Sequence, residues 1–259
     1  MCGRYASTKN PARLAAEFDA ADATGEDAPE PDYNVAPTKP VIAVVTRHPR
    51  DADGTPDPDH TVRSLRVMQW GLVPHWAKQR SIGNKMINAR SETAGTKPAY
   101  RDAMIRRRCL LPADGWFEWR RDGAAKQPFY LTRSDGASLA MAGLWSVWRD
   151  PADPDASLLV TCAVLTRAAV GPLAEIHDRM PVLLGPERWA AWLDPDRADV
   201  AELLAEPDQA VLDTLELRPV SDAVNNVRNG GPSLIELVEP STQLDEPALF
   251  DLTHDAARR

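Results

Sequence analysis

Residues 129–166 read FYLTRSDGASLAMAGLWSVWRDPADPDASLLVTCAVLT. This stretch contains three apolar runs, at 129–133, 139–148 and 157–166. The clusters RSDG and RDPADPD, which favour turns, separate the runs. Short apolar runs bounded by Gly, Pro, Asp and Ser are typical of strands in a sheet. The stretch therefore predicts three consecutive β-strands.

The rest of the chain continues this pattern and adds few helices. Further strands are predicted, in chain order, at 41–46, 64–74, within 104–119 and at 232–240. Helical patterns occur at 11–21, 185–193 and 197–206. Many short strands with few helices in no regular alternation favour a β-rich α+β domain over a doubly wound sheet.

Length and composition limit the class of protein. The chain has 259 residues, 43% of them hydrophobic, and no run of about 18 apolar residues that predicts a membrane span. The N-terminus has no apolar segment typical of a secretory signal. The three cysteines, Cys2, Cys109 and Cys162, are widely spaced and form no CxxC pair. We therefore expect a single large domain in a reducing cytoplasm, without a disulfide framework, a metal or a cofactor.

The net charge of −8 hides an uneven distribution. Residues 186–259 carry 16 acidic and 6 basic side chains, whereas residues 1–185 carry 22 acidic and 24 basic ones. A basic groove can therefore coexist with an acidic flank, so the overall charge does not exclude a nucleic-acid partner.

Cys2 stands where removal of Met1 would leave it at the N-terminus. An N-terminal cysteine carries an α-amine with a pKa of about 8 next to a thiol with a pKa near 8.5. Such a pair condenses with an aldehyde, because the amine forms an imine and the thiol closes it to a thiazolidine. The alternative is a cysteine that follows Met by chance and has no role.

Two motifs offer groups for acid/base chemistry. GWFEW (115–119) places Glu118 in an aromatic strand, where burial would raise its pKa toward neutrality. By strand alternation Glu118 could instead face solvent. HDRMP (177–181) places His177 beside a carboxylate and an arginine, and a histidine there can move protons near pH 7. The alternative is a structural histidine in a turn.

Other polar and aromatic residues are candidates for contacts with nucleic acid. INARSET (87–93) contains Asn88 and Arg90, and DYNVAPT (32–38) contains Asn34. The basic side chains available for a groove are Arg4, Arg90, Arg101, Arg106, Arg107, Arg108 and Arg228. The side chains available for stacking are Trp70, His75, Trp76 and Trp116. Taken singly, these arginines also fit a solvated edge and these tryptophans a core.

Seven motifs occur in order over residues 1–240: MCGRYA, YNVAPT, WGLVPHW, INARSET, GWFEW, IHDRMPV and PVSDAVNNVRN. Together they resemble the SRAP family, the SOS response-associated peptidase-like proteins. The resemblance implies one SRAP domain over 1–240, with sheets curled into a barrel-like core, peripheral helices and a positively charged cleft for single-stranded DNA. A loop insertion at about 47–60 and a polar tail at 241–259 lie outside the motifs.

The resemblance also implies roles for individual residues. After removal of Met1, Cys2 would form a stable thiazolidine crosslink with the aldehyde of an abasic site, and Asn88 would hold the sugar beside it. Glu118 and His177 would be the acid/base pair that opens the sugar ring, forms the imine and reverses the crosslink. The DNA-binding residues would be Arg4, Asn34, Trp76, Arg90 and Arg228, with Asn34 also positioning Cys2 and Trp76 acting as a stacking wedge.

Two functions follow as hypotheses. The first is a monomeric protein of the DNA damage or SOS response that shields abasic sites in single-stranded DNA by covalent attachment, an activity of crosslinking or lyase type. The second is a cysteine peptidase, a hydrolase in which Cys2 is an N-terminal nucleophile. A non-catalytic binding module is the remaining alternative.

Overall fold

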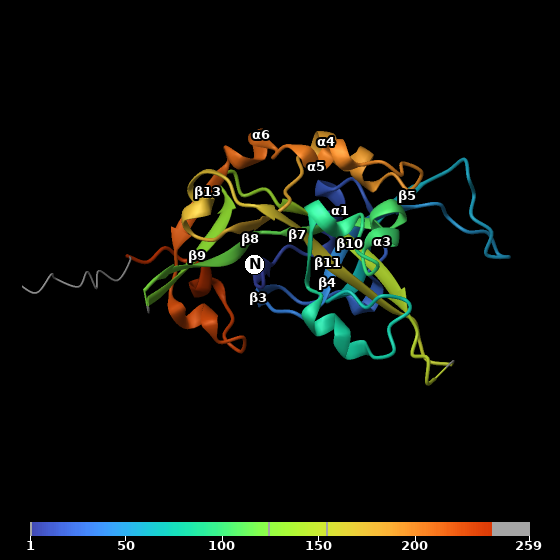
Figure 1. The fold of residues 1–259 in the computed structure, drawn as a ribbon, viewed down its shortest axis with the longest axis horizontal. Helices are drawn as coiled ribbons and strands as arrows, with labels where there is room; N and C mark the ends of the chain where they lie inside the picture. Colours follow the sequence, from blue (N-terminus) through green and yellow to red (C-terminus); the bar gives the residue numbers. More distant parts are fainter. Residues whose placement is uncertain (1, 124, 154, 240–259) are drawn as a thin grey trace, which may run out of the picture.

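Two β-sheets form the frame of the protein in a computed structural model that describes residues 2–123, 125–153 and 155–239 (Figure 1). Within these residues the smaller sheet has five antiparallel strands in the order β13-β9-β8-β1-β3. Their bounds are Leu215–Pro219 (β13), Ala125–Arg133 (β9), Gly115–Asp122 (β8), Tyr5–Ser7 (β1) and Asp32–Val35 (β3). The N-terminal strand thus lies inside this sheet, between β8 and β3.

The larger sheet curls back on itself. Its order is β12-β11-β10-β7-β4-β5-β2, and β6 pairs with β11 outside this order. The bounds are Arg179–Pro181 (β12), Leu159–Ala168 (β11), Leu139–Trp148 (β10), Arg108–Ala113 (β7), Pro40–Arg47 (β4), Val62–Trp70 (β5), Ala21–Asp22 (β2) and Asn88–Arg90 (β6). Because β11 also pairs with β5, through Cys162 and Trp70, the strands between them enclose a shared interior.

Short helices lie around the sheets, with α4, α5 and α6 along one side (Figure 1). The α-helices are Pro11–Glu17 (α1), Ser91–Ala94 (α2), Arg101–Arg106 (α3), Pro186–Leu193 (α4), Ala201–Ala205 (α5) and Gln209–Leu212 (α6). The 3-10 helices are Gly25–Asp27 (η1), Arg80–Lys85 (η2), Gly171–Glu175 (η3), Asp222–Asn225 (η4) and Pro232–Ile235 (η5). None of the helices in the described part of the chain has the length and apolar character needed to cross a membrane.

The chain passes directly from the larger sheet into the smaller one after β7. Ala113 ends β7, Asp114 donates its main-chain N–H to the carbonyl of Ala6 in β1, and Gly115 begins β8. This connection brings the GWFEW motif beside the N-terminal strand. The apolar interior of the curled sheet extends to the same place, because Cys2 is completely buried and belongs to that core.

The β-rich α+β class predicted from the sequence is confirmed, and the run 139–148 coincides with β10. The predicted helix 11–21 is shorter, because α1 ends at Glu17 and Asp19 takes a positive φ of 47°. The segment 104–119, within which the sequence predicts one strand, contains the end of α3 and two strands, β7 and β8.

The strand predicted at 232–240 is wrong. Residues Pro232–Ile235 form the 3-10 helix η5, and the last strand among the described residues is instead β13, Leu215–Pro219, which the sequence reasoning missed. The sequence LELRP has no long apolar run, and it becomes a strand because its backbone pairs with β9 from Leu215 to Pro219. Tertiary pairing overrides weak local propensity here. The predicted tail at 241–259 lies outside the described residues.

Candidate functional site

Cys2 is held by the N-terminal segment that runs antiparallel to β8. The main-chain N–H of Phe117 donates to the carbonyl of Arg4 at 2.9 Å, and Tyr5 pairs with Trp116. Cys2 is completely buried, and this burial raises the pKa of its thiol well above the ordinary value. The negative charge of Glu118 raises the same pKa further. The Cys2 thiol is therefore protonated at neutral pH.

Glu118 is a buried carboxyl group. Its side chain is only 3% exposed. Its neighbour Phe117 in β8, which points to the opposite face of the strand, is buried as well. Phe117 packs with Tyr130 and Ala6 on one face of the strand, and Glu118 faces the other, so both faces of β8 are covered. Loss of hydration raises the pKa of Glu118 from 4.5 to about 7. A carboxyl group with this pKa can both donate and accept protons near neutral pH.

Asn88 reaches Cys2 directly. Its side-chain Nδ2 donates a hydrogen bond of 2.7 Å to the main-chain carbonyl of Cys2. The position of Asn88 is set by β6, which pairs with β11 opposite Val164, and by the Tyr100 hydroxyl, which donates to the Asn88 carbonyl at 3.1 Å. The Asn88 Oδ1 atom is buried and accepts no hydrogen bond from the described residues. It is available to a donor on a bound ligand.

His177 lies between η3 and β12. Its Nδ1 atom is 2.9 Å from the main-chain nitrogen of Arg179 and 2.8 Å from the Asp178 carboxylate. Burial lowers the pKa of His177, so the imidazole is neutral at pH 7. The charge of Asp178 opposes this shift, and the same charge adds to the raised pKa of Glu118. The charge of Asp178 therefore raises the pKa of both titrating groups.

The INARSET and IHDRMPV motifs are joined by an ion pair that the sequence reasoning missed. Arg179 in β12 donates to both carboxylate oxygens of Glu92 in α2, at 2.6 and 2.9 Å, and to the carbonyl of Thr166 in β11 at 2.6 Å. The hydrogen bonds from Arg179 lower the pKa of Glu92 to about 2. Glu92 lies in INARSET and Arg179 in IHDRMPV, so both residues were among the motifs. The sequence does not show that the two side chains meet.

Arg4 and Asn34 form a connection beneath the surface. The Arg4 Nη1 atom donates to Asn34 Oδ1 at 2.7 Å and to the carbonyl of Val224 at 2.8 Å. Asn34 is completely buried and donates in turn to the carbonyls of Asn226 and Asn229. Thus YNVAPT and the PVSDAVNNVRN segment are tied together through the residue that follows Gly3. No hydrogen bond from Asn34 to Cys2 occurs among the described residues.

The remaining residues proposed to contact DNA are on the surface. Trp76 is 52% exposed, and Arg90 and Arg228 are exposed as well. Three other candidates are core residues and offer no surface to a ligand. Trp70 and Trp116 have no exposed surface, and Arg108, 4% exposed, donates to main-chain carbonyls such as those of Trp192 and Met104.

The arrangement brings residues 2, 88, 118 and 177 into one region from four distant parts of the chain. It combines a buried thiol, a carboxyl group that titrates near pH 7, a neutral imidazole and an amide. Within the described residues, no group of three or more His, Cys, Asp or Glu side chains is placed to hold a metal ion. The chemistry available to these four side chains is proton transfer and nucleophilic attack.

Comparison with known proteins extends this description. Residues 1–227 match the family described as SOS response associated peptidase (SRAP). The chain is 35% identical over 239 residues to the abasic site processing protein YoqW of Bacillus subtilis, covering 91% of this chain and 99% of that protein. It is 33% identical over 242 residues to the abasic site processing protein YedK of Escherichia coli, covering 92% and 100%. The abasic site processing protein HMCES of Xenopus tropicalis is 30% identical, covering 96% of this chain and 82% of that protein.

Solved structures show the same fold. A crystal structure of a protein from Bacteroides thetaiotaomicron has a TM-score of 0.74 at 23% identity, covering 92% of this chain and all of that one. A phage-related protein from Bordetella bronchiseptica has a TM-score of 0.58 at 30% identity, covering 86% of this chain and 95% of that one.

Proposed function

The chain belongs to the SOS response associated peptidase (SRAP) family, and from this premise we propose that it processes abasic sites in DNA by covalent attachment through Cys2. The relatives named above are abasic site processing proteins. The observation that carries the proposal is the contact of Asn88 with Cys2 beside Glu118, a carboxyl group whose pKa is raised to about 7. The DNA that it binds in this proposal is single-stranded.

The chemistry begins once hydrolysis of the Met1–Cys2 bond has produced a free α-amine on Cys2. The amine nitrogen adds to the C1′ aldehyde carbon of the opened sugar and gives a carbinolamine. A proton from the Glu118 carboxyl group lets the hydroxyl leave as water, and the carboxylate takes up the proton that the nitrogen loses. The product of this stage is an imine.

The thiol then closes the ring. The Cys2 sulfur adds to the imine carbon while its proton passes to the imine nitrogen, so the thiazolidine forms with the loss of one water overall. Because the thiolate is the nucleophilic form, the thiol gives up its proton as the sulfur attacks, and that proton ends on the nitrogen. The burial that raises the pKa of the Cys2 thiol therefore favours attack by the amine first and by sulfur second.

Asn88 and His177 have supporting roles in this scheme. Asn88 Oδ1, buried and without a donor among the described residues, would accept a hydrogen bond from a sugar hydroxyl beside Cys2. His177, neutral at pH 7, would take the proton of the C1′ hydroxyl as the sugar ring opens and pass it to the ring oxygen O4′, and it would move protons in the opposite direction when the crosslink reverses.

The DNA strand would lie across the exposed residues near these groups. Arg90, two positions after Asn88 in β6, and Arg228 would bind phosphates, and the exposed ring of Trp76 would stack in the gap left by the missing base. Arg4 would contact the strand from its half-buried position. Asn34, being completely buried, would act by holding Arg4 and the 226–229 segment.

A peptidase with Cys2 as nucleophile is supported less well. Cysteine peptidases attack with a thiolate whose pKa is lowered by a neighbouring histidine cation. The Cys2 thiol has a raised pKa and a negatively charged neighbour in Glu118, and His177 is neutral. These groups disfavour a thiolate and favour a reaction led by the amine.

The first experiment is a denaturing gel of the protein without Met1, mixed with labelled single-stranded DNA that carries one abasic site. We expect a shifted band that survives heat and detergent without borohydride. The Cys2→Ala variant should lose this band and keep its binding to intact DNA, because the variant leaves the surface arginines unchanged. An intact strand is the control for the abasic site.

Absence of the band, with removal of Met1 verified by mass spectrometry, would reject covalent attachment. Cleavage of peptides that persists in the presence of abasic DNA and needs Cys2 would support the peptidase instead.

A further inference from the structure

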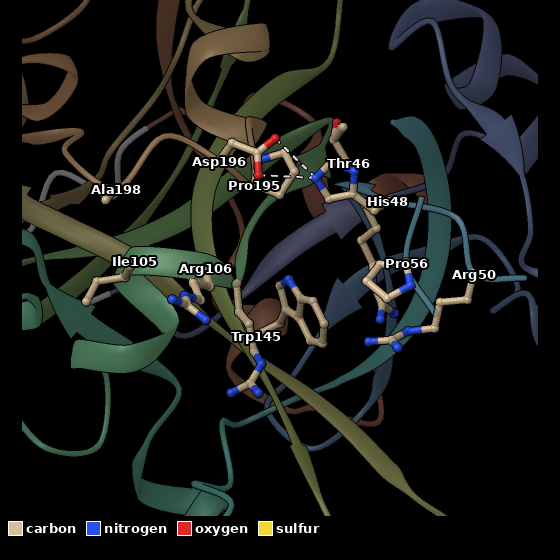
Figure 2. A pocket seen from close by; sticks show the side chains of 12 residues that line it. Thr46, His48, Arg50, Pro56, Ile105, Arg106, Trp145, Pro195, Asp196 and Ala198 are labelled. Atoms are coloured by element: carbon tan, nitrogen blue, oxygen red, sulfur yellow. Dashed lines mark hydrogen bonds and ion pairs between the residues drawn. The ribbon is translucent and has the colours of Figure 1, made fainter. Parts of the chain in front are cut away.

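A cavity lies at the end of the curled sheet where β4 stops and β7 begins (Figure 2). Its volume is about 570 Å³. We call it the Arg47 pocket, after the residue that ends β4. The side chains that matter for its chemistry are Arg47, His48, Arg50, Arg106, Arg107 and Trp145.

The pocket is strongly basic. Four arginines line it, and Arg66 lines an adjoining hollow of about 310 Å³ that shares Arg47, His48 and Arg50. Within the described part of the chain, none of these five guanidinium groups forms an ion pair with a carboxylate. Like charges gathered without counter-ions repel one another. A bound polyanion would remove this repulsion.

Two of the arginines lie over the ring of Trp145. The guanidinium carbon of Arg47 lies 5.2 Å from the centre of the Trp145 ring, and that of Arg107 lies 5.9 Å from it. Trp145 itself is 6% exposed and extends from β10 into the pocket (Figure 2). Stacking on an aromatic face restricts the flexible arginine side chains, so less entropy is lost when they bind an anion.

The carboxylate in the lining, that of Asp196, is already engaged. The His48 Nε2 atom lies 3.1 Å from this carboxylate, and its Nδ1 atom lies 2.7 and 2.9 Å from the carbonyls of Asp57 and His60. Figure 2 marks the contact between His48 and Asp196 with dashed lines. Both ring nitrogens therefore face acceptors, an arrangement that suits the doubly protonated imidazolium. His48 thus contacts Asp196 and holds the 47–60 loop as one wall of the pocket.

The Arg47 pocket is separate from the Cys2 region. The residues that line it do not include Cys2, Asn88, Glu118 or His177. Arg107 precedes β7, whereas Asp114 follows it and leads to β8, so the length of β7, roughly 20 Å, separates the pocket from the start of the strand that carries Glu118.

From this geometry we propose that the Arg47 pocket is a binding site for two or more adjacent phosphate groups. Guanidinium groups match phosphate oxygens in a bidentate manner, and four of them exceed what a single phosphate would neutralise. A cavity of this volume also accepts more than one phosphate. Adjacent phosphates occur in the backbone of a nucleic-acid strand and in a free polyphosphate such as a nucleoside triphosphate, and the test separates these two sources.

The test uses two probes with the full-length protein. Isothermal titration calorimetry measures binding of inorganic tripolyphosphate, and fluorescence anisotropy measures binding of a labelled single-stranded oligonucleotide without abasic sites. The variant Arg47→Gln/Arg107→Gln should weaken tripolyphosphate binding at least tenfold. The matched control is Arg13→Gln, an exposed arginine of α1, which should bind like the wild type.

A second variant guards against a change in folding. Arg50→Gln/Arg106→Gln removes two arginines of the pocket that do not stack on Trp145, and it should also weaken tripolyphosphate binding. If either variant also weakens oligonucleotide binding and tripolyphosphate displaces the oligonucleotide, the ligand is a nucleic-acid strand. If oligonucleotide binding is unchanged, the ligand is a free polyphosphate.

The proposal is overturned if the wild type does not bind tripolyphosphate, or if folded forms of both variants bind it as tightly as the wild type. The proposal is independent of the crosslink, because Cys2 does not line the Arg47 pocket. The variant Cys2→Ala should therefore keep tripolyphosphate binding. A failed crosslink experiment therefore leaves this test intact.

Discussion

The carboxyl group of Glu118 is 3% exposed and lies within electrostatic range of Cys2 and Asp178. In sequence, its neighbours Phe117 and Trp119 suggest an apolar setting, but strand alternation leaves open which face it takes. Burial of both faces of β8 decides the question and raises the pKa of Glu118 to about 7. The acid/base group is thus produced by the packing of β8 against the N-terminal segment.

Replacing Glu118 should slow crosslink formation. Glu118→Gln keeps the shape of the side chain and removes its ionisation, so we expect the rate of thiazolidine formation to fall by about 100-fold or more at pH 7. The pH dependence with a midpoint near 7 should disappear. Time courses on denaturing gels between pH 5 and pH 9 (roughly the range in which such a group titrates) measure both effects.

The same variant should change how stability depends on pH. The folded-state pKa of Glu118 is raised, so the protonated form favours the folded state, and its contribution is present below pH 4.5 and lost as the pH rises through about 7. Above pH 7, Glu118→Gln should be more stable than the wild type by up to about 3 kcal/mol, as urea unfolding would measure. Glu26→Gln, an exposed carboxylate in η1, is the control. Equal stability of Glu118→Gln and wild type at pH 5 and pH 8 would contradict a raised pKa.

Among the elements, β8 depends on a glycine at its start. A Cβ atom on Gly115 would lie 2.6 Å from the Tyr130 hydroxyl oxygen and still closer to the carbonyl oxygen of Leu131 in β9. Because Gly115 pairs with Thr132, β8 and β9 approach one another closely at this point. The close packing of β8 on β9 therefore requires a glycine at position 115, at the start of the strand that carries Glu118.

Gly115→Ala should destabilise the protein. Separating β8 from β9 to make room for a methyl group should lower the free energy of unfolding by about 2 kcal/mol or more. Gly95→Ala is the matched control, because nothing lies within 4 Å of a Cβ there and Gly95 has a φ of −68° that alanine accepts. Urea unfolding of both variants measures the difference, and equal midpoints would show that β8 and β9 tolerate the methyl group.

At the scale of the whole molecule, charge is distributed by region. The chain has a net charge of −8, yet the Arg47 pocket and the exposed arginines Arg90 and Arg228 are basic. Acidic residues are concentrated after residue 186. A protein with a negative overall charge can therefore bind a polyanion on a local surface.

Binding to intact single-stranded DNA should weaken as salt rises. Each phosphate that the protein binds releases counterions, so the affinity should fall steeply between about 50 and 200 mM salt. Arg90→Gln/Arg228→Gln should reduce the slope of log affinity against log salt by about 0.7 for each phosphate that the variant no longer neutralises. Fluorescence anisotropy over a salt series measures the slope. An affinity that does not change with salt would exclude phosphate binding as the source of the affinity.

The sequence predicted the class of the fold because short apolar runs between turn-forming clusters indicate strands without knowledge of the tertiary structure. The run 139–148 is apolar and bounded by turn-forming clusters, as a buried strand should be, and it coincides with β10. Leu215–Pro219 could not be found in this way, because its strand conformation comes from pairing with β9. The link from Arg179 to Glu92 was also invisible, since it joins residues 87 positions apart.

The sequence by itself determined that the protein is β-rich, that Cys2 stands next to Met1, and that seven motifs of one family occur in order. Only the tertiary structure decided which of the candidate side chains are buried and which meet. It places Asn88 on the carbonyl of Cys2, covers both faces of β8 around Glu118, and puts Trp70, Trp116 and Arg108 in the core. The physical reason is that a pKa or a hydrogen bond depends on which distant segments exclude water from a group, and sheet pairing, which sets those neighbours, is not written in local sequence.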